Sequence, residues 1–175
     1  AISSALPKLS NISKVQILTG LREMGDAAAH DQVAALISHD NLDVSVAAIS
    51  ALAVIGDKSD VMLLAKTAAS SAGDIQGQAR SSLALLNAPG VDEAVLTALP
   101  KADAKSKVEL VQAIGERQMK TSVPTLLNAA KDENARVRVA ALKSLGLVAA
   151  QDDMGALVAL LIKTTTNAER REAER

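Results

Sequence analysis

A short apolar helix that ends near a glycine recurs along the chain, and this recurrence is the feature that most constrains the fold. Its clearest copy is Ala135–Gly146, where apolar residues follow helical spacing. Comparable end points, each preceded by an apolar residue, are Gly146, Gly115, Asn87, Gly56 and Gly25, and their residue numbers differ in turn by 31, 28, 31 and 31. A fixed period of this length indicates stacked repeat units, because one such unit alone buries too little apolar surface to be stable.

Two short segments that occur twice in the sequence support the same period. The segment Ala5-Leu6-Pro7-Lys8 recurs as Ala98-Leu99-Pro100-Lys101, and Ser13-Lys14-Val15 recurs as Ser106-Lys107-Val108. In both cases the residue numbers differ by 93, which is three times 31. The one shorter step is therefore a local contraction, either in the turn at Pro100 or at one end of the helix within Ala104–Ile114.

The residues between the end points predict a second helix in each unit, so helices occur in pairs with polar turns between them. The predicted helices span residues 13–24, 27–38, 44–55, 60–69, 75–86, 91–99, 104–114, 122–130, 135–145 and 152–163. Asp26, Asp43 and Asp103 are predicted N-caps, and Gly25 and Asn87 are predicted to take the left-handed conformation that ends a helix. No strand pattern occurs. We predict an all-α fold, a right-handed α-solenoid (an α-α superhelix) of about five to six helix pairs, outer and inner helices alternating.

Composition excludes several classes of site. The chain has no Phe, Tyr, Trp or Cys, so its core is built from Ala, Leu, Val and Ile. Without these residues there is no aromatic platform for stacking bases and no thiolate nucleophile or metal ligand. A net charge of −1 gives no global field that attracts phosphates. The longest apolar stretches, such as Val46–Ile55, are shorter than a membrane span. We expect neither nucleic-acid nor membrane binding.

The segment Ser122–Gly146 resembles HEAT repeats of the short bacterial, phycobilin-lyase-like type. The matching residues are Pro124, Leu126, Leu127, Asp132, Val137, Arg138, Ala140, Ala141, Leu145 and Gly146. The period extends the resemblance over nearly all of the chain, although the family's arginine is replaced by Ser45 and Gln76 in two copies. The resemblance implies an armadillo-like superhelix. We expect residues 1–175 to form a single HEAT-repeat array, excised from a longer polypeptide.

Basic residues on the inner helices are the candidate binding site, because neighbouring inner helices could form a basic ridge on a concave face. The candidates are Arg80, Lys107, Arg136, Arg138 and Lys143. A structural role competes with binding. In the resembling family the arginine after valine bonds to an acidic turn of a neighbouring unit, and this role is open to Arg138 with Asp132 or Asp103. We favour the structural role, since isolated charges on solenoid helices are usually solvated or paired.

Other potentially reactive residues have structural interpretations. His30 and His39 are nine residues apart, which matches no metal-ligand signature, so we interpret them as surface histidines. The carboxylate pairs Asp152-Asp153, Asp40 with Asp43, and Asp92-Glu93 stand at predicted helix starts, where free N–H groups favour an acid.

Two further segments are weaker candidates. Gly73–Gly77 lacks the strand and lysine of a phosphate-binding loop, and we interpret it as a loose turn. In Asn167–Arg175 the charges nearly cancel, and the segment is interpreted as the first turns of another inner helix.

These observations favour a non-catalytic protein-binding or scaffolding module that uses a concave face of inner helices, without metal or cofactor. The partner would be another protein or another domain of the same polypeptide. As an alternative, the resemblance implies an accessory or spacer domain of a larger bacterial envelope enzyme or cytochrome-type protein, located in the periplasm or envelope. A HEAT-type lyase or DNA-glycosylase-like enzyme is a second alternative, disfavoured because a DNA channel would need aromatic residues. No catalytic residue is predicted.

Overall fold

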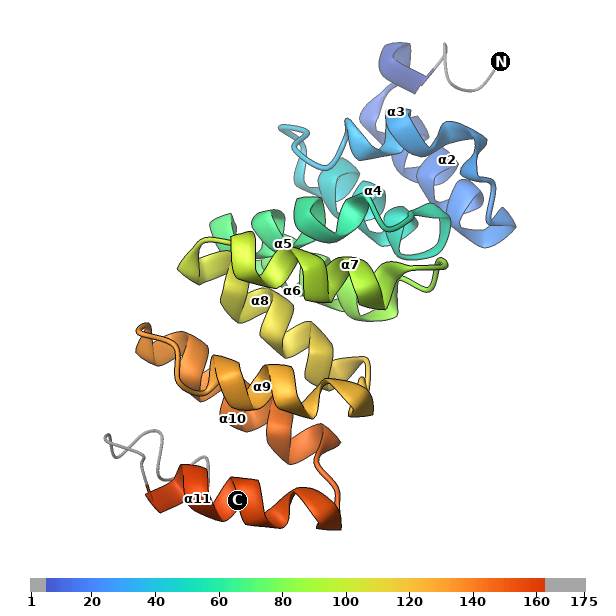
Figure 1. The fold of residues 1–175 in the computed structure, drawn as a ribbon. Helices are drawn as coiled ribbons and strands as arrows, with labels where there is room; N and C mark the ends of the chain where they lie inside the picture. The colour runs from blue at the N-terminus through green and yellow to red at the C-terminus, as the bar shows by residue number, and fades with distance from the viewer. Residues whose placement is uncertain (1–5, 163–175) are drawn as a thin grey trace. The chain divides into compact units, whose positions relative to one another are not determined.

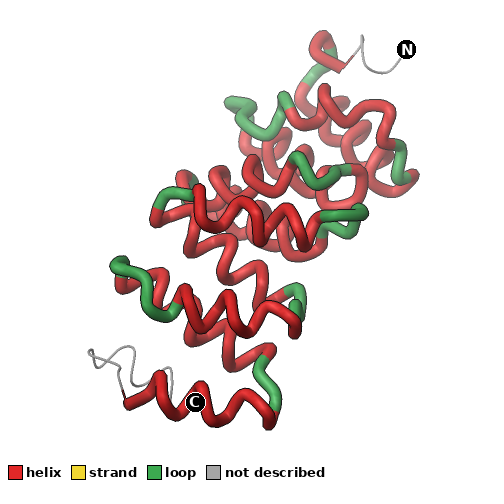
Figure 2. The backbone as a smooth tube through the Cα atoms, in the orientation of Figure 1, coloured by secondary structure: helices red, strands yellow, loops and turns green. Residues whose placement is uncertain are grey.

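The computed structural model describes residues 6–162, and in this range all regular structure is helical (Figures 1 and 2). Ten α-helices and five short 3-10 helices occur there, with no strand. The predicted all-α solenoid architecture is confirmed. No helix within residues 6–162 is both long and apolar enough to cross a membrane. Asn167–Arg175, predicted to begin another helix, lies outside the described residues.

The helices alternate between inner and outer positions in the repeat. The inner helices are α2 (Asn11–Met24), α4 (Leu42–Ile55), α6 (Gly73–Leu85), α8 (Ala104–Glu116) and α10 (Ala135–Val148). The outer helices are α3 (His30–Ala34), α5 (Asp60–Ser70), α7 (Val91–Ala98), α9 (Val123–Ala129) and α11 (Met154–Ile162). The 3-10 helices are η1 (Leu6–Lys8), η2 (Ala27–Ala29), η3 (Leu99–Lys101), η4 (Lys120–Ser122) and η5 (Gln151–Asp153).

Contacts divide the chain into two compact units, Ala1–Ala94 (unit 1) and Val95–Arg175 (unit 2). In unit 1, α4 packs between α2 and α6, while α3 packs on α4 and α5 on α6. In unit 2, α10 packs against both α8 and α9. Each unit therefore has a layer of adjacent inner helices and a layer of outer helices (Figure 1).

The repeat is more regular than its glycine end points indicate. The five inner helices begin at residues 11, 42, 73, 104 and 135, so the residue number rises by 31 at every step. The expected local contraction at Pro100 or in the fourth inner helix is therefore wrong. It arose because Gly115 and Gly146 lie within α8 and α10, whereas Gly25 follows the end of α2.

The left-handed end of the inner helix also follows the strict period. Gly25 has φ 65° and ends α2, as predicted. Its equivalent three periods later is Gln118, with φ 55°. Gln118 is the one non-glycine residue with positive φ among the described residues, so the prediction for Asn87 is wrong. Gly56 follows α4 as predicted, but in an extended conformation.

The core contains one series of equivalent apolar positions on the inner helices, which we call the packing ladder. The residues Leu21, Leu52, Leu83, Ile114 and Leu145 stand one repeat period apart and are at most 1% exposed. Two buried serines tie inner helices together, because Ser82 Oγ donates to the carbonyl of Ile49 and Ser144 Oγ to that of Val111, each at 2.8 Å. Burial of these hydroxyls is tolerated because each has a partner.

Polar caps fix where the inner helices start. Side chains of Ser10, Asn41, Asp103 and Asn134 accept hydrogen bonds from N–H groups in the first turns of α2, α4, α8 and α10. The N–H and hydroxyl of Ser106 hold the pKa of Asp103 below its ordinary value. The prediction for Asp103 is confirmed.

Other predicted starts need correction. Asp26 caps η2 as predicted. Asp43 does not cap α4: Asn41 does, and Asp43 lies in the first turn, where an acid is still favourable. Gly73–Gly77, predicted as a turn, forms the start of α6, because Gly73 takes a positive φ at the helix entry.

Candidate interaction face of the inner helices

A groove of about 610 Å³ runs along the inner helices of unit 1. Its walls are Asn11, Ile12, Val15, Gln16, Thr19 and Arg22 from α2, Asn41, Asp43, Val46, Ala47 and Ser50 at α4, and Gln78 from α6. The groove is therefore built where adjacent inner helices pack side by side, because side chains at their seam are too short to fill the space between them.

The lining residues occupy equivalent positions in the repeat. Ile12, Val15 and Thr19 of α2 stand one repeat period before Asp43, Val46 and Ser50 of α4, and both sets line the groove. We call these three positions the inner-face positions. In unit 2 they hold Lys105, Val108 and Gln112 on α8, and Arg136, Val139 and Lys143 on α10. The inner-face positions are thus largely uncharged in α2 and α4 but basic in α8 and α10.

Two of the five predicted binding residues, Arg136 and Lys143, occupy inner-face positions. Both side chains are exposed, and neither forms an ion pair with a described residue. Lys105 is exposed as well. Because no ion pair with a described residue offsets them, these exposed cations give α8 and α10 a positive face.

Lys107 and Arg138, two other predicted binding residues, brace the acidic turn between α9 and α10. Lys107 Nζ lies 3.0 Å from Asp132 Oδ2. The Arg138 guanidinium donates to the carbonyl oxygens of Asp132 and Glu133, both at 2.9 Å. The pKa of Asp132 is lowered by the N–H of Asn134 and, to a smaller extent, by Lys107. Arg138 therefore has a structural role, as favoured, but its acceptors are backbone carbonyls of the turn that directly precedes its own helix, not of a neighbouring unit.

The same position in the first three inner helices also bonds to a turn or to the last turn of an outer helix. Lys14 Nζ lies 3.3 Å from His39 Nε2, Ser45 Oγ donates to the carbonyl of Ile37, and Gln76 Nε2 donates to the carbonyl of Ala68 at 2.9 Å. In all five inner helices the family's arginine position therefore holds a side chain that bonds to a turn or to the end of an outer helix. Lys, Ser, Gln and Arg all occur at this position, because each can donate a hydrogen bond to a nearby acceptor.

Arg80, the fifth predicted binding residue, stands at a packing position. Its equivalents are Leu18, Ile49, Val111 and Leu142, all buried. Arg80 itself is half-buried and is held by polar or electrostatic contacts. It belongs to neither the groove walls nor the inner-face positions.

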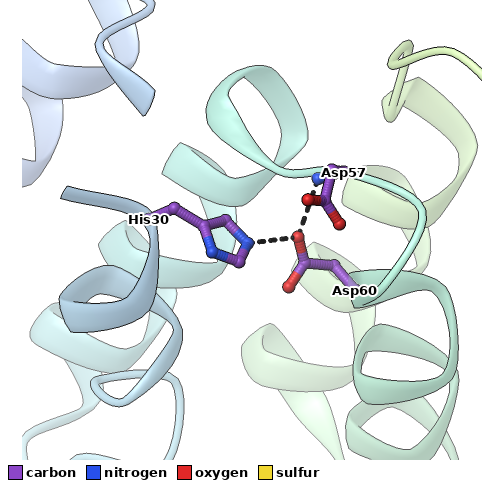
Figure 3. Close-up of side chains that lie close together, drawn as sticks. All are labelled: His30, Asp57 and Asp60. Carbon is purple, nitrogen blue, oxygen red and sulfur yellow. Dashed lines mark hydrogen bonds and ion pairs between the residues drawn. The ribbon is translucent and has the colours of Figure 1, made fainter. Parts of the chain in front are cut away.

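A cluster that the sequence did not indicate joins α3 to the start of α5 (Figure 3). His30 Nε2 lies 2.7 Å from Asp60 Oδ2, and the same oxygen accepts the N–H of Asp57 at 2.8 Å. His30 Nδ1 lies 3.0 Å from Asp31 Oδ1. The Asp60 side chain is 3% exposed and that of His30 is 21% exposed, so the interpretation of His30 as a surface histidine is wrong.

The geometry of the cluster favours a charged imidazole. A neutral imidazole has one N–H and can donate to one carboxylate, whereas both His30 nitrogens face carboxylate oxygens. The hydrogen bond to Asp60 is the largest cause that raises the pKa of His30. Burial opposes this rise, and the bond to Asp31 supports it.

The same three residues carry nitrogen and oxygen atoms of the kinds that bind metal ions. His30, Asp57 and Asp60 each offer one ligand atom, all within 4.8 Å of one another. Nitrogen and oxygen ligands about 2.0–2.2 Å from a tetrahedral zinc stand more than about 3 Å apart. The 2.7 Å between His30 Nε2 and Asp60 Oδ2 fits a shared proton better. The cluster is accordingly a charge-assisted brace between α3 and α5.

His39 also has a structural role. Its Nδ1 accepts the N–H of Asn41 at 3.0 Å, while Nε2 faces Lys14. The partners His30 and Asp60 are 30 residues apart, so no local motif indicates that they pair. The one related signal in the sequence is the repeat period, because Asp60 begins the outer helix of the unit that follows the unit containing His30.

A second hollow, of about 750 Å³, lies in unit 2. Apolar residues of η3 and α9, including Leu99 and Pro124, form one part of its lining, and the braced ion pair of Lys107 and Asp132 forms another. Its cations and acids are mixed, so it does not select a ligand of one charge.

One comparison with known proteins matches part of the chain. Residues 93–175 match the family model described as HEAT repeats. The match includes α8 to α11, and therefore the braced turn and the basic inner-face positions of unit 2. No curated protein matches the chain.

Proposed function

Because residues 93–175 belong to the HEAT-repeat family, we propose that residues 1–175 form one array of such repeats that acts as a non-catalytic protein-binding or scaffolding module. HEAT repeats typically mediate protein interaction or scaffolding, and the family is generally non-catalytic. The binding surface is the set of inner-face positions.

The supporting observation is the contrast between packing and inner-face positions. The packing ladder from Leu21 to Leu145 holds Leu or Ile in every copy. The inner-face positions instead hold one charged residue, Asp43, among the six of α2 and α4, but three cations, Lys105, Arg136 and Lys143, among the six of α8 and α10. Residues that face solvent and differ between copies can encode recognition without disturbing the stack, because they contribute little to packing.

The chemistry of α8 and α10 selects an acidic protein partner. Lys105, Arg136 and Lys143 supply three exposed cations from two adjacent helices. These cations attract an acidic segment of a partner more than a neutral or basic one, mainly by raising its association rate. Nucleic acid is the poorer partner, because the net charge of the chain is −1 and no aromatic residue can stack on a base.

The test uses the 175-residue chain. Affinity capture is performed with this protein and with Arg136→Glu/Lys143→Glu, followed by identification of the bound proteins. The proposal expects an acidic partner to be retained by the first protein and lost by the double variant.

Lys120→Glu is the matched control, because Lys120 is exposed on η4 and stands outside the inner-face positions. It should retain the partner. Equal loss in Lys120→Glu, or equal retention by the double variant, would contradict the proposed surface.

A further inference from the structure

The groove in unit 1 has an apolar centre and one opposite charge near each end. Val15, Val46 and Ala47 line its middle, and Ile12, with 74% of its surface exposed, stands on its wall. Asp43 lies in the first turn of α4, and Arg22 lies in the last turn of α2. The polar residues between these charges are uncharged.

Neither charge is neutralised among the described residues. Arg22 donates to Ser50 Oγ at 2.9 Å but forms no ion pair there, and Asp43 likewise has no cationic partner in residues 6–162. The register equivalent of Arg22 in α4 is Ala53, ten residues after Asp43. Ten residues of helix span about 15 Å, so the charges lie nearly three helical turns apart along the groove.

An α-helix suits this groove better than an extended segment. The walls are helices, whose backbone groups bond within the helix, so no sheet edge can pair with an extended chain. The seam between α2 and α4 can instead receive the apolar stripe of a third helix, as ridges pack into grooves.

The charges also select a direction. The paired lining positions, from Ile12 with Asp43 to Thr19 with Ser50, show that α2 and α4 run parallel. A helix antiparallel to both would begin near Arg22 and end near Asp43. An acid near its first turn and a base near its last turn would then meet opposite charges and would also be favourable for its own dipole.

We propose that the groove between α2 and α4 receives an amphipathic helix of a protein partner, antiparallel to both, with an acidic side chain over Arg22 and a basic side chain about three turns later over Asp43. This inference rests on the proposed role of the inner face in protein binding. It names the chemistry of the partner that unit 1 recognises.

The probe is a fluorescent, alanine-based peptide of roughly sixteen residues, a length at which isolated helices begin to be stable. It carries glutamate near its start, leucines one and two turns later, and lysine three turns later. Fluorescence anisotropy at low ionic strength measures its binding to the full 175-residue chain. A second peptide exchanges the glutamate and the lysine.

The original peptide should bind, and the exchanged peptide should bind about tenfold more weakly, since each exposed ion pair contributes a few-fold at most. Arg22→Glu/Asp43→Lys should reverse this preference. Ile12→Ser should weaken both peptides. The matched control is Met24→Ser, because Met24 is 67% exposed but does not line the groove, and it should leave binding unchanged.

Three results would overturn the inference: no saturable binding of the original peptide, equal affinity for both peptides, or an unchanged preference in the double variant whose circular dichroism remains native. Concentration-dependent dimerisation that is abolished by Ile12→Ser would assign the groove to a second copy of the chain instead. Capture that still depends on Arg136 and Lys143 would show that the proposed function survives such a failure.

Discussion

Two equivalent glycines provide a matched test of how closely the inner helices pack. Gly115 of α8 and Gly146 of α10 stand one repeat period apart, each within its helix. A Cβ added to Gly115 would lie 2.8 Å from Ser144 Oγ and 2.9 Å from Ser144 Cα, whereas one added to Gly146 would meet nothing within 4 Å. Because one of the Gly115 contacts is to backbone, a change of side-chain rotamer cannot relieve it.

Gly115→Ala should therefore destabilise the chain and Gly146→Ala should stabilise it. Overpacking costs about 1–3 kcal/mol, and strain on the hydrogen bond from Ser144 to Val111 adds up to about 1 kcal/mol. Replacing glycine by alanine inside a helix returns about 1 kcal/mol at either site. The net expectation is a loss of up to about 3 kcal/mol for Gly115→Ala and a gain of up to about 1 kcal/mol for Gly146→Ala.

Thermal unfolding followed by far-ultraviolet circular dichroism measures both variants beside the unaltered chain. Each kcal/mol corresponds to about 2–4 °C in a protein of this size. Opposite shifts in Tm are expected. If Gly115→Ala were as stable as Gly146→Ala, the close approach of α8 and α10 at Ser144 would be refuted.

Substitutions at a brace, a helix end and a cap test the local structure. His30→Gln should destabilise by about 1–3 kcal/mol at acidic pH, because it removes a charged hydrogen bond to buried Asp60. The folded pKa of His30 is raised above 6.5, so its stabilisation is complete below that value and is lost as pH rises through the folded pKa. Urea midpoints measured against pH should fall over that range for the unaltered chain and fall less for His30→Gln; parallel curves would contradict the imidazolium. Gln118→Gly should stabilise the fold by up to about 1 kcal/mol, since a residue with a side chain is strained in the left-handed conformation. Gly25→Ala should destabilise it by about 1–2 kcal/mol for the same reason. Thermal unfolding of both variants tests this, and Tm shifts of equal sign would contradict it. Asn41→Ala should cost about 1 kcal/mol by removing the cap of α4, and an unchanged urea midpoint would show that the cap contributes nothing.

The fold could be predicted because the same pattern of buried apolar positions occurs in five successive repeats. Leu21 and its four equivalents fill one buried position, and their spacing is visible in the sequence without any partner. The predicted register of the fourth copy was wrong because glycine has two different structural roles in this chain. Gly25 adopts a positive φ at a helix end, whereas Gly115 leaves room for Ser144 inside a helix. The sequence alone does not show which of these roles a glycine has.

The candidate site was only partly accessible from sequence. The role of Arg138 as a turn brace could be foreseen, because its acceptor turn lies six residues away in the chain. The pairing of His30 with Asp60 could not, since it depends on how two successive outer helices meet. The unit 1 groove was also missed, because Val15 and Val46 have the same apolar character as core residues.

The central claim is that inner-face positions, and not the outer helices, carry recognition. Photo-crosslinking tests it most directly: a photoreactive amino acid is placed at Arg136, at Lys143 or, on outer helix α9, at exposed Asn128. Crosslinks to the captured acidic partner are predicted from the two inner-face positions and not from Asn128. Crosslinks from Asn128 alone would contradict the account.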